Sequence, residues 1–315
     1  MIKHLTYEEI DKNKWDDCIT NSFNGIIYGY SWYLNVVCDS WEGLIENDYE
    51  RVFPLTFRKR SGIHYLFQPF FTQQLGVFSR SKLNEDVVED FISHIPAKYK
   101  FAEINLNTFN KLDENKFSLT ANLTHELDLI PSYDTISRKY SDNTKRNMKQ
   151  AVNAELSIAK NTDIDQIITI FRQNKGTEIN TFKDNDYLTL KKLVNLCIYK
   201  KAAKLWGVET KERKICAGAV FIESNSKVIF LFSATSSEAK STGAMSFLID
   251  SFIKENAQHN ITLDFEGSND ANLARFYKSF GAKECVYYQY KKNDLTWILS
   301  KSLTFIKWLK KKFRI

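Results

Sequence analysis

The sequence predicts a mixed α/β fold of the α+β kind, in which two halves repeat one order of elements. Apolar residues recur at helical spacing in some segments and alternate in others, as helices and half-buried strands require. In each half a helix (Val87–Ile95; Gly243–Glu255) precedes a strand (Phe101–Leu106; Ile261–Glu266). A chain of 315 residues with 43% hydrophobic side chains can fill two cores. We therefore expect two tandem domains, each a mixed, mostly antiparallel sheet flanked by helices.

The first predicted domain covers residues 1–130. Pro131 marks its end, because proline and the residue before it resist continued regular structure. Besides the helix and strand given above, this half is expected to contain one or two helices in Lys12–Cys38 and strands at Leu44–Ile45, Arg51–Phe57, Gly62–Phe71 and Ser118–Leu129.

The second predicted domain covers residues 131–292. Its three central strands are joined by short polar connections, which are typical of antiparallel hairpins. A last strand, Lys283–Lys291, closes this half. The other expected elements are a connecting helix Tyr133–Val152, a strand Glu155–Ala159, helices Thr162–Gln173 and Asp186–Tyr199, and the central strands Lys204–Thr210, Ile215–Glu223 and Lys227–Ala234.

The net charge of +6 is concentrated at the end of the chain. Residues 291–315 carry eight Lys or Arg side chains and one acid, so the rest of the chain is slightly negative. The body is therefore not a generally basic nucleic-acid binder. Five scattered cysteines lack any metal-ligand spacing, which predicts no metal and a reducing compartment. Without a signal peptide or a membrane-spanning run, the expected location is the cytoplasm.

The stretch Tyr133–Val152 places Arg138, Lys145 and Lys149 along one helical face. One interpretation is a connecting helix with a solvated basic face, as charge runs usually are. The other is a basic stripe that meets the phosphates of a donor or an acceptor.

A possible donor site follows the strand that ends at Ala234. The loop Ser236–Thr242 leads to Gly243 at the start of a helix, and a helix N-terminus behind such a loop is a general anion-binding device. The alternative is an ordinary strand-to-helix connection. The corresponding loop of the first half, Ser79–Asp86, has no glycine and two acids. Donor chemistry is therefore expected in the second half.

The motifs in this region resemble those of the GNAT superfamily of N-acetyltransferases. The segment Lys240–Met245 is similar to the superfamily's Arg/Gln-x-x-Gly-x-Gly/Ala signature, with lysine in the first place and Met245 in the last. The segment Asn269–Ala282, NDANLARFYKSFGA, is similar to a second motif through Asn272, Ala274, Phe276-Tyr277 and Gly281. The resemblance implies an acyl-CoA, most simply acetyl-CoA, as co-substrate.

The order Phe280-Gly281, the preceding Asp264–Gly267 and the repeated element order look more like the Fem-type subgroup. Proteins of that group have two tandem acetyltransferase-like domains and transfer amino acids from aminoacyl-tRNA to peptidoglycan precursors. The resemblance implies a small-molecule or envelope-precursor acceptor. Nucleic acid would be a partner only if tRNA is the donor. A helical-hairpin insertion found in some members has no counterpart in this sequence.

Acyl transfer needs an anchored donor, a polarised carbonyl and groups that move protons. By resemblance, the donor would be held by the backbone of Ser233 and Ala234, by Asn272 and by the loop residues Lys240, Ser241, Thr242, Gly243 and Ala244. Tyr277 matches the tyrosine that protonates the leaving thiolate, and its other interpretation is a packed helical tyrosine. Asp264 or Glu266 would act as general base or bind a cationic acceptor, unless both are solvated or salt-bridged acids. The five histidines, His125 among them, are interpreted as structural or surface residues.

The tail, residues 293–315, mixes lysines with tryptophan and phenylalanine from Leu295 onward. Such a basic amphipathic helix suits peripheral contact with the inner face of a membrane, or packing on its own domain. Three functions remain open from the sequence: a CoA-dependent acyltransferase, a Fem-type aminoacyl transferase, and a degenerate binding protein without catalysis. The sequence does not determine the oligomeric state.

Overall fold

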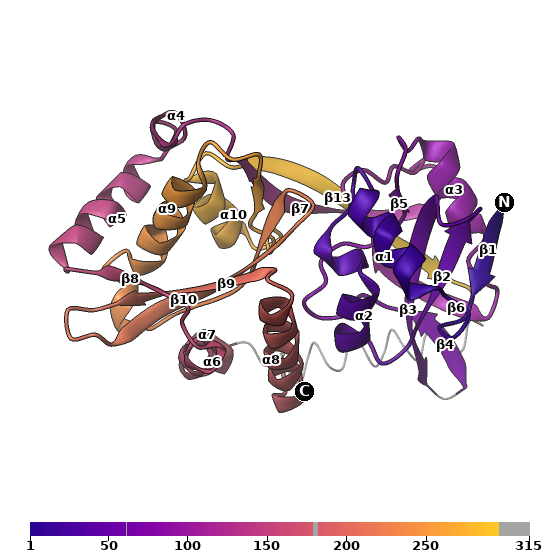
Figure 1. Ribbon diagram of the computed structural model, residues 1–315, viewed down its shortest axis with the longest axis horizontal. Helices are drawn as coiled ribbons and strands as arrows, with labels where there is room; N and C mark the ends of the chain where they lie inside the picture. Colours follow the sequence, from indigo (N-terminus) through magenta and orange to yellow (C-terminus); the bar gives the residue numbers. More distant parts are fainter. Residues whose placement is uncertain (61, 179–181, 296–315) are drawn as a thin grey trace. The chain divides into compact units, whose positions relative to one another are not determined.

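The computed structural model describes residues 1–60, 62–178 and 182–295. The chain forms two compact units, one made of residues 1–122 with residues 287–295, and the other of residues 123–286 (Figure 1). No helix in the described ranges is long and apolar enough to cross a membrane. The predicted tail lies outside the described residues from position 296 onward.

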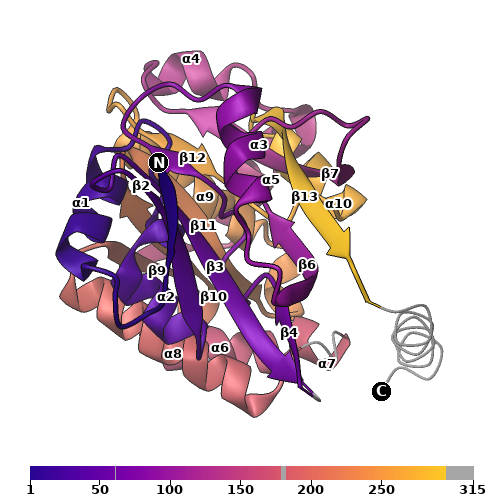
Figure 2. The ribbon, with the colours of Figure 1, turned by 90° about the vertical axis from the view of Figure 1, so that its right-hand side faces the viewer.

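The first unit is built on a mixed sheet in the order β1-β2-β3-β4-β6-β13, with β5 beside β3. Its strands pair antiparallel except for β4 and β6, which run parallel. Helices α1 and α2 lie on one side of this sheet and α3 on the other (Figure 2). The elements are β1 (Ile2–Leu5), α1 (Lys12–Asn21), a short 3-10 turn (Ile27–Gly29), α2 (Ser31–Val37), β2 (Trp41–Glu46), β3 (Arg51–Arg60), β4 (Ile63–Leu66), β5 (Phe78–Ser79), α3 (Glu85–Ser93) and β6 (Tyr99–Asn105).

The second unit repeats this plan, with the sheet order β8-β9-β10-β11-β12-β7. Again all pairs are antiparallel except one, β11 with β12. Its elements are β7 (Ser118–Asp128), α4 (Tyr133–Ser137), α5 (Asp142–Asn153), β8 (Ser157–Lys160), α6 (Ile164–Gln173), α7 (Lys175–Glu178), α8 (Asp184–Tyr199), β9 (Ala203–Glu209), β10 (Ile215–Ser224), β11 (Lys227–Thr235), a 3-10 turn (Glu238–Lys240), α9 (Ala244–Asn256), β12 (Thr262–Asp264), α10 (Ala271–Lys278) and β13 (Lys283–Asn293).

The predicted domain boundaries, residues 130 and 292, differ from the limits of the two compact units. The reason is that the long strands β7 and β13 each contribute one part to each unit. The end of β7 pairs with β12 in the second unit, through Glu126–Asp128. The end of β13 pairs with β6 in the first unit, through Gln289–Asn293. Each sheet is therefore completed by a strand from the other half of the sequence, which alternation along a single strand does not reveal.

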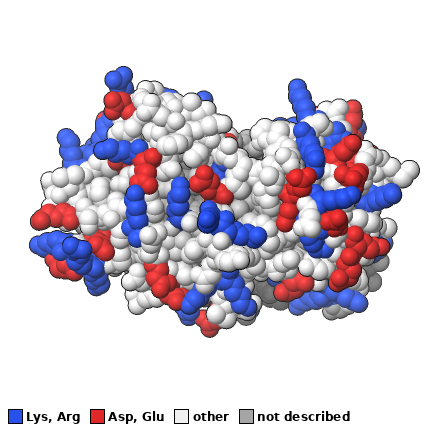
Figure 3. Space-filling view, in the orientation of Figure 1, with Lys and Arg blue, Asp and Glu red and all other residues white. Residues whose placement is uncertain are grey.

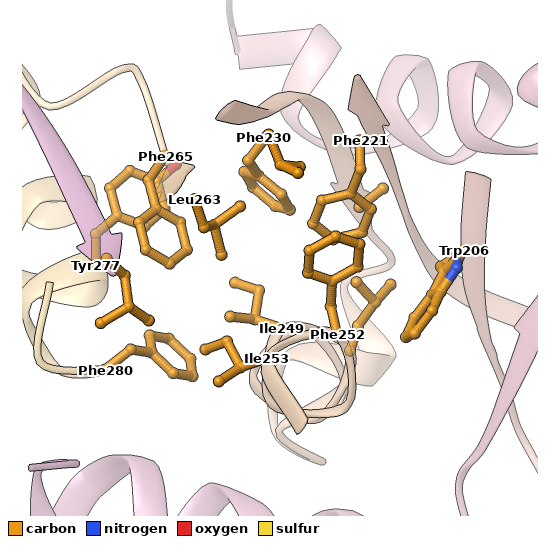
Figure 4. Close-up of a cluster of buried hydrophobic side chains, with 14 of the residues drawn as sticks. Trp206, Phe221, Phe230, Ile249, Phe252, Ile253, Leu263, Phe265, Tyr277 and Phe280 are labelled. Atoms are coloured by element: carbon orange, nitrogen blue, oxygen red, sulfur yellow. The ribbon is translucent and has the colours of Figure 1, made fainter. Parts of the chain in front are cut away.

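Helices cover the second sheet on both faces. Helices α6 and α8 pack on one face, and α9 and α10 lie on the other (Figure 1). The core on the α9 side contains stacked aromatic rings: Phe221 stacks on Phe252 with ring centroids 3.8 Å apart, and Phe265 stacks on Tyr277 (Figure 4). The predicted connecting helix is divided into α4 and α5, because Ser141 caps a new helix by accepting from the Thr144 N–H.

Candidate active site

The parallel strands β11 and β12 separate after three paired positions. Lys227–Ile229 pairs with Thr262–Asp264, after which β12 ends and β11 continues to Thr235. A bulge at Leu231 shifts the β10–β11 register at this point, which bends the strand. Within the described chain, no strand pairs with residues 230–235 on the β12 side. Ser233 and Ala234, the predicted donor contacts, lie on this free edge.

In the first unit, a later segment of the chain lies at the point where the two parallel strands separate. Strands β4 and β6 also part after a short parallel pairing, at Leu66 and Ala102. The segment after β4 then returns beside β6, where the Leu75 N–H donates to the Asn105 carbonyl at 2.8 Å. The Gln68 side chain accepts from the Asn105 N–H at 2.9 Å. Among its described residues, the first unit therefore offers no open strand edge at this position.

The predicted loop is only partly accessible. Lys240 and Ser241 are exposed and Thr242 is half-buried, whereas Gly243 and Ala244 are buried. Gly243 has a φ of 73°, and a Cβ there would lie 2.5 Å from the Asn147 carbonyl oxygen of α5. The glycine is therefore required by the close packing of α5 on α9, whatever its part in binding.

The first turn of α9 still offers backbone donors. An α-helix leaves its first N–H groups without intrahelical acceptors. In α9 the first intrahelical acceptor is the Gly243 carbonyl, which takes the Phe247 N–H at 2.9 Å. The preceding amides, from Ala244 to Ser246, have no acceptor within the helix, but Ala244 and Ser246 are themselves buried. At the start of α10, Asn272 is exposed and its N–H is bound by Asp270.

Glu266 has the most unusual environment among the predicted site residues. It follows β12 in a left-handed conformation with a φ of 53°, and Gly267 continues with a φ of 56°. Its Oε1 atom is buried without a hydrogen-bond partner in the described structure. Burial raises the pKa of this carboxyl to about 8. A carboxyl group with this pKa can exchange protons near neutral pH.

Tyr277 of α10 is packed and lies near Glu266. The ring stacks on Phe265 at 4.8 Å and meets Phe230 of β11 edge-on (Figure 4). Burial, followed by the charges of Glu266 and Asp270, raises the pKa of its hydroxyl. The hydroxyl therefore stays protonated at neutral pH. The position of Tyr277 is compatible with both interpretations, a packed helical tyrosine and a general acid. A ring that packs in the core can still donate the proton of its hydroxyl group.

Asp264 is not part of this group. Its side chain accepts from Thr124 Oγ1 and forms an ion pair with Lys227, whose Nζ also bonds Glu126. The prediction placed Asp264 and Glu266 on one strand face, but β12 ends at Asp264 and the left-handed Glu266 interrupts the alternation. Asp264 instead accepts the Glu266 N–H at 3.1 Å, so it holds the backbone of the turn.

His125 was not predicted as a site residue, yet it supports the same turn. Ser268 Oγ donates to the Glu266 carbonyl at 2.9 Å and lies 2.7 Å from His125 Nδ1. Nδ1 must then carry the proton, because the serine hydrogen is already donated. His125 Nε2 is buried and has no partner among the described residues. Burial and then Lys278 lower the pKa of this imidazole, which keeps it neutral. In the sequence, this histidine lies inside the predicted strand Ser118–Leu129, and that position was the signal that could have indicated its role.

The basic stripe is on the surface of the second unit. Arg138 follows α4, and Lys145 and Lys149 lie on α5; all three are exposed. Within the described ranges none of the three forms an ion pair. Figure 3 shows basic and acidic side chains interspersed over the visible face, as expected for a body of nearly zero net charge.

Comparisons with known proteins agree with the predicted fold. No family model and no characterised protein sequence matches the chain. Among solved structures, FemX superimposes with a TM-score of 0.63 and 12% identity, covering 91% of this chain and 96% of FemX. L-PGS from Bacillus licheniformis gives 0.56 and 13%, over 93% and 96% of the two chains. A C-terminal domain assigned to a lysylphosphatidylglycerol synthetase of Agrobacterium fabrum gives 0.53 and 11%, over 95% and 96%.

At these identities the likeness concerns the fold. It confirms the predicted fold class, which this chain shares with FemX and L-PGS. The mixed, mostly antiparallel sheets with flanking helices agree with that class in both units.

Proposed function

We propose that this protein is an acyltransferase whose reaction site lies in the second unit, where β11 separates from β12. The observation that carries the proposal is the free edge of β11, which begins at Phe230, the residue that Tyr277 contacts edge-on. An extended acyl arm can pair with such an edge as an added strand does. The backbone of Ser233 and Ala234 would hold the arm. The first-turn amides of α9, with Lys240, would face its phosphates. The donor is an acyl-CoA, most simply acetyl-CoA, and no metal takes part.

The reaction proceeds by attack of an acceptor amine or hydroxyl on the donor carbonyl. Glu266, in its ionised form, accepts the proton of the attacking group. The tetrahedral adduct then breaks its carbon–sulfur bond, and the Tyr277 hydroxyl donates a proton to the leaving thiolate. The His125–Ser268 pair and Asp264 act as positioning residues, because they hold the Glu266 backbone in its left-handed conformation. The acceptor class proposed is a cell-envelope precursor, which suits a cytoplasmic enzyme at the inner face of the membrane.

The first experiment measures acetyl-CoA binding by calorimetry and release of CoA thiol in the presence of a panel of amines. We expect saturable binding and amine-dependent thiol release that rises with pH as Glu266 ionises. The Glu266→Gln variant should bind the donor but release thiol at least roughly a hundredfold more slowly. The matched control, Glu155→Gln, changes an exposed glutamate that also has a φ of 53° but lies between α5 and β8. No donor binding would overturn the CoA proposal, and binding without turnover would leave a degenerate binding protein.

A second candidate function is an aminoacyl transfer that uses charged tRNA. It is favoured by the three exposed cations Arg138, Lys145 and Lys149, which lack acidic partners in the described structure. Binding of tRNA should then weaken steeply with salt, because each phosphate contact releases counterions. Replacing the three by glutamine should reduce the log–log salt slope by roughly 2–3. Replacing Lys59, Lys82 and Lys192, exposed lysines elsewhere, should leave the slope unchanged. Salt-independent or absent binding excludes this donor.

A further inference from the structure

The hairpin formed by β3 and β4 projects from the first unit, and the proposed reaction does not use it (Figure 1). Strand β2 pairs with β3 only as far as Thr56, whereas β4 pairs with Phe57–Arg60. The last residues of β3 therefore extend beyond β2. Among the described strands, none pairs with Arg58–Arg60 on the side away from β4. The far end of this hairpin is thus accessible to a partner.

The hairpin carries positive charge that no acid neutralises. Residues 51–84 contain six Lys or Arg side chains and no Asp or Glu. Two of the six, Arg51 and Arg80, form ion pairs with acids from other parts of the first unit. The consecutive cations Arg58–Arg60 are all exposed, and none of them forms an ion pair in the described structure. This part of the unit therefore attracts anions, although the body of the chain is slightly negative.

One face of the hairpin combines two of these cations with apolar side chains. Arg58 lies opposite Tyr65 and Arg60 lies opposite Ile63, and residues directly opposite each other in a sheet project from the same face. Phe67 is on this face as well, because its ring centroid lies 4.2 Å from the Arg58 guanidinium and 6.3 Å from the Tyr65 ring. Ile63, Tyr65 and Phe67 are half-buried, so each keeps part of its side chain at the surface.

Two other roles account for only part of this face. Cations on a free strand edge often prevent pairing with another chain, but that role does not require three apolar side chains beside them. Binding of single-stranded nucleic acid requires open ring faces on which bases stack. The Arg58 guanidinium already covers one face of the Phe67 ring, which disfavours this ligand.

The headgroup region of a membrane suits both the cations and the apolar side chains. Lys and Arg side chains reach lipid phosphates while their alkyl stems stay in apolar surroundings, and tyrosine is favoured at the level of the headgroups. Each cation near an anionic membrane surface contributes roughly fivefold to the binding constant.

We propose that the β3–β4 hairpin binds the surface of a membrane that contains anionic lipids. Ile63 and Tyr65 enter the headgroup region, and Arg58, Lys59 and Arg60 contact the lipid phosphates. This surface is distinct from the basic tail, and the proposal does not depend on acyl transfer or on the identity of a donor.

The test measures partition of the full chain onto vesicles of phosphatidylcholine mixed with phosphatidylglycerol, and onto vesicles of phosphatidylcholine alone. We expect binding to the anionic vesicles only. The variant Arg58→Gln/Lys59→Gln/Arg60→Gln should lower the partition coefficient at least roughly tenfold. Ile63→Ser, which keeps the charge, should lower it roughly threefold. Hydrogen exchange should become slower in the hairpin when the anionic vesicles are added.

The matched control is Lys3→Gln/Lys82→Gln/Lys192→Gln, which removes three exposed cations outside the hairpin and should leave the partition coefficient within roughly twofold. An equal loss in the control and the hairpin variant would overturn the proposal, because general charge would then explain the binding. Unchanged partition of the hairpin variant would also overturn it and would assign any binding to another surface.

A single-stranded oligonucleotide serves as the competing ligand. Slower exchange in the hairpin with the oligonucleotide, but not with the anionic vesicles, would overturn the membrane proposal in favour of nucleic acid. Thiol release is measured without vesicles. Its loss would therefore reject acyl transfer alone, and the two proposals fail independently.

Discussion

At the scale of single residues, two features of Glu266 lower the stability of the folded protein. A non-glycine residue with a φ of 53° is strained, and a carboxyl oxygen buried without a partner loses its hydration. Three neighbours, His125, Ser268 and Asp264, nevertheless hold this turn in place. Strain that the surroundings maintain is typical of functional sites, which is why Glu266 is the residue on which the proposal can best be tested.

The pKa of Glu266 makes stability depend on pH. Because its folded pKa is raised from 4.5 to about 8, the folded state binds the proton more tightly than the unfolded chain. The stabilisation is complete below the unfolded pKa and is lost as the pH rises through the folded pKa. Glu266→Gln removes this contribution. We expect the difference in Tm, variant minus wild type, to become more positive between pH 5 and pH 8. Parallel Tm curves would show that the carboxyl is ionised in the folded state.

Tyr277→Phe separates the two interpretations of Tyr277. The substitution keeps the ring that stacks on Phe265 and removes only the hydroxyl. As a general acid, Tyr277 should contribute about a hundredfold to kcat with little change in KM. Tyr290→Phe, a buried tyrosine of β13, serves as the control and should leave kcat unchanged. Unaltered turnover in Tyr277→Phe would assign the residue to packing.

At the scale of elements, α5 and α9 approach each other more closely than a side chain at Gly243 would permit. Asn147 Nδ2 bonds Ser246 Oγ at 3.0 Å across the same contact. The contact positions the basic residues of α5 relative to the first turn of α9 within one unit. A large residue at Gly243 therefore tests packing together with donor binding.

Gly243→Ala measures this contact. The Cβ would meet the Asn147 backbone at 2.5–3.0 Å, in addition to the left-handed φ. We expect a loss of roughly 2–4 kcal/mol in the free energy of unfolding. Gly267→Ala is the matched control, because its φ of 56° is also left-handed but the nearest contact is Leu273 Cδ1 at 3.6 Å. It should cost about 1–2 kcal/mol. The free energies of unfolding are measured by chemical denaturation. Equal losses in the two variants would mean that α5 shifts to accommodate the added Cβ.

At the scale of the whole molecule, the two halves of the sequence exchange strands. Tyr290 lies in the last strand of the second half of the sequence, but it is buried against Ile104 and Phe117 of the first unit. Tyr290→Ala should therefore destabilise the first unit by roughly 3 kcal/mol. Hydrogen exchange should speed up in β6 more than in β10. A change confined to β10 and its neighbours would contradict the exchanged arrangement.

Much of the element order follows from local patterns. Alternation and helical spacing located β3, α3, α8 and α9 within a few residues, because each buries one face along its own length. The longer predicted strands Gly62–Phe71 and Ile261–Glu266 shorten to β4 and β12, since both leave the sheet where the parallel pairs separate. Apolar residues such as Phe265 continue the pattern beyond the strand because they still pack into the core.

The sequence by itself determined the repeated α/β plan, and it predicts from the motif residues Asn269–Ala282 that donor chemistry belongs to the second half. Tertiary structure decided which strand completes each sheet, that Asp264 is engaged by Lys227 and Thr124, and that His125 supports Glu266. The physical reason is that periodicity reports which face of an element is buried. A hydrogen bond or a strand edge depends on partners more than a hundred residues away, as for Thr124 with Asp264.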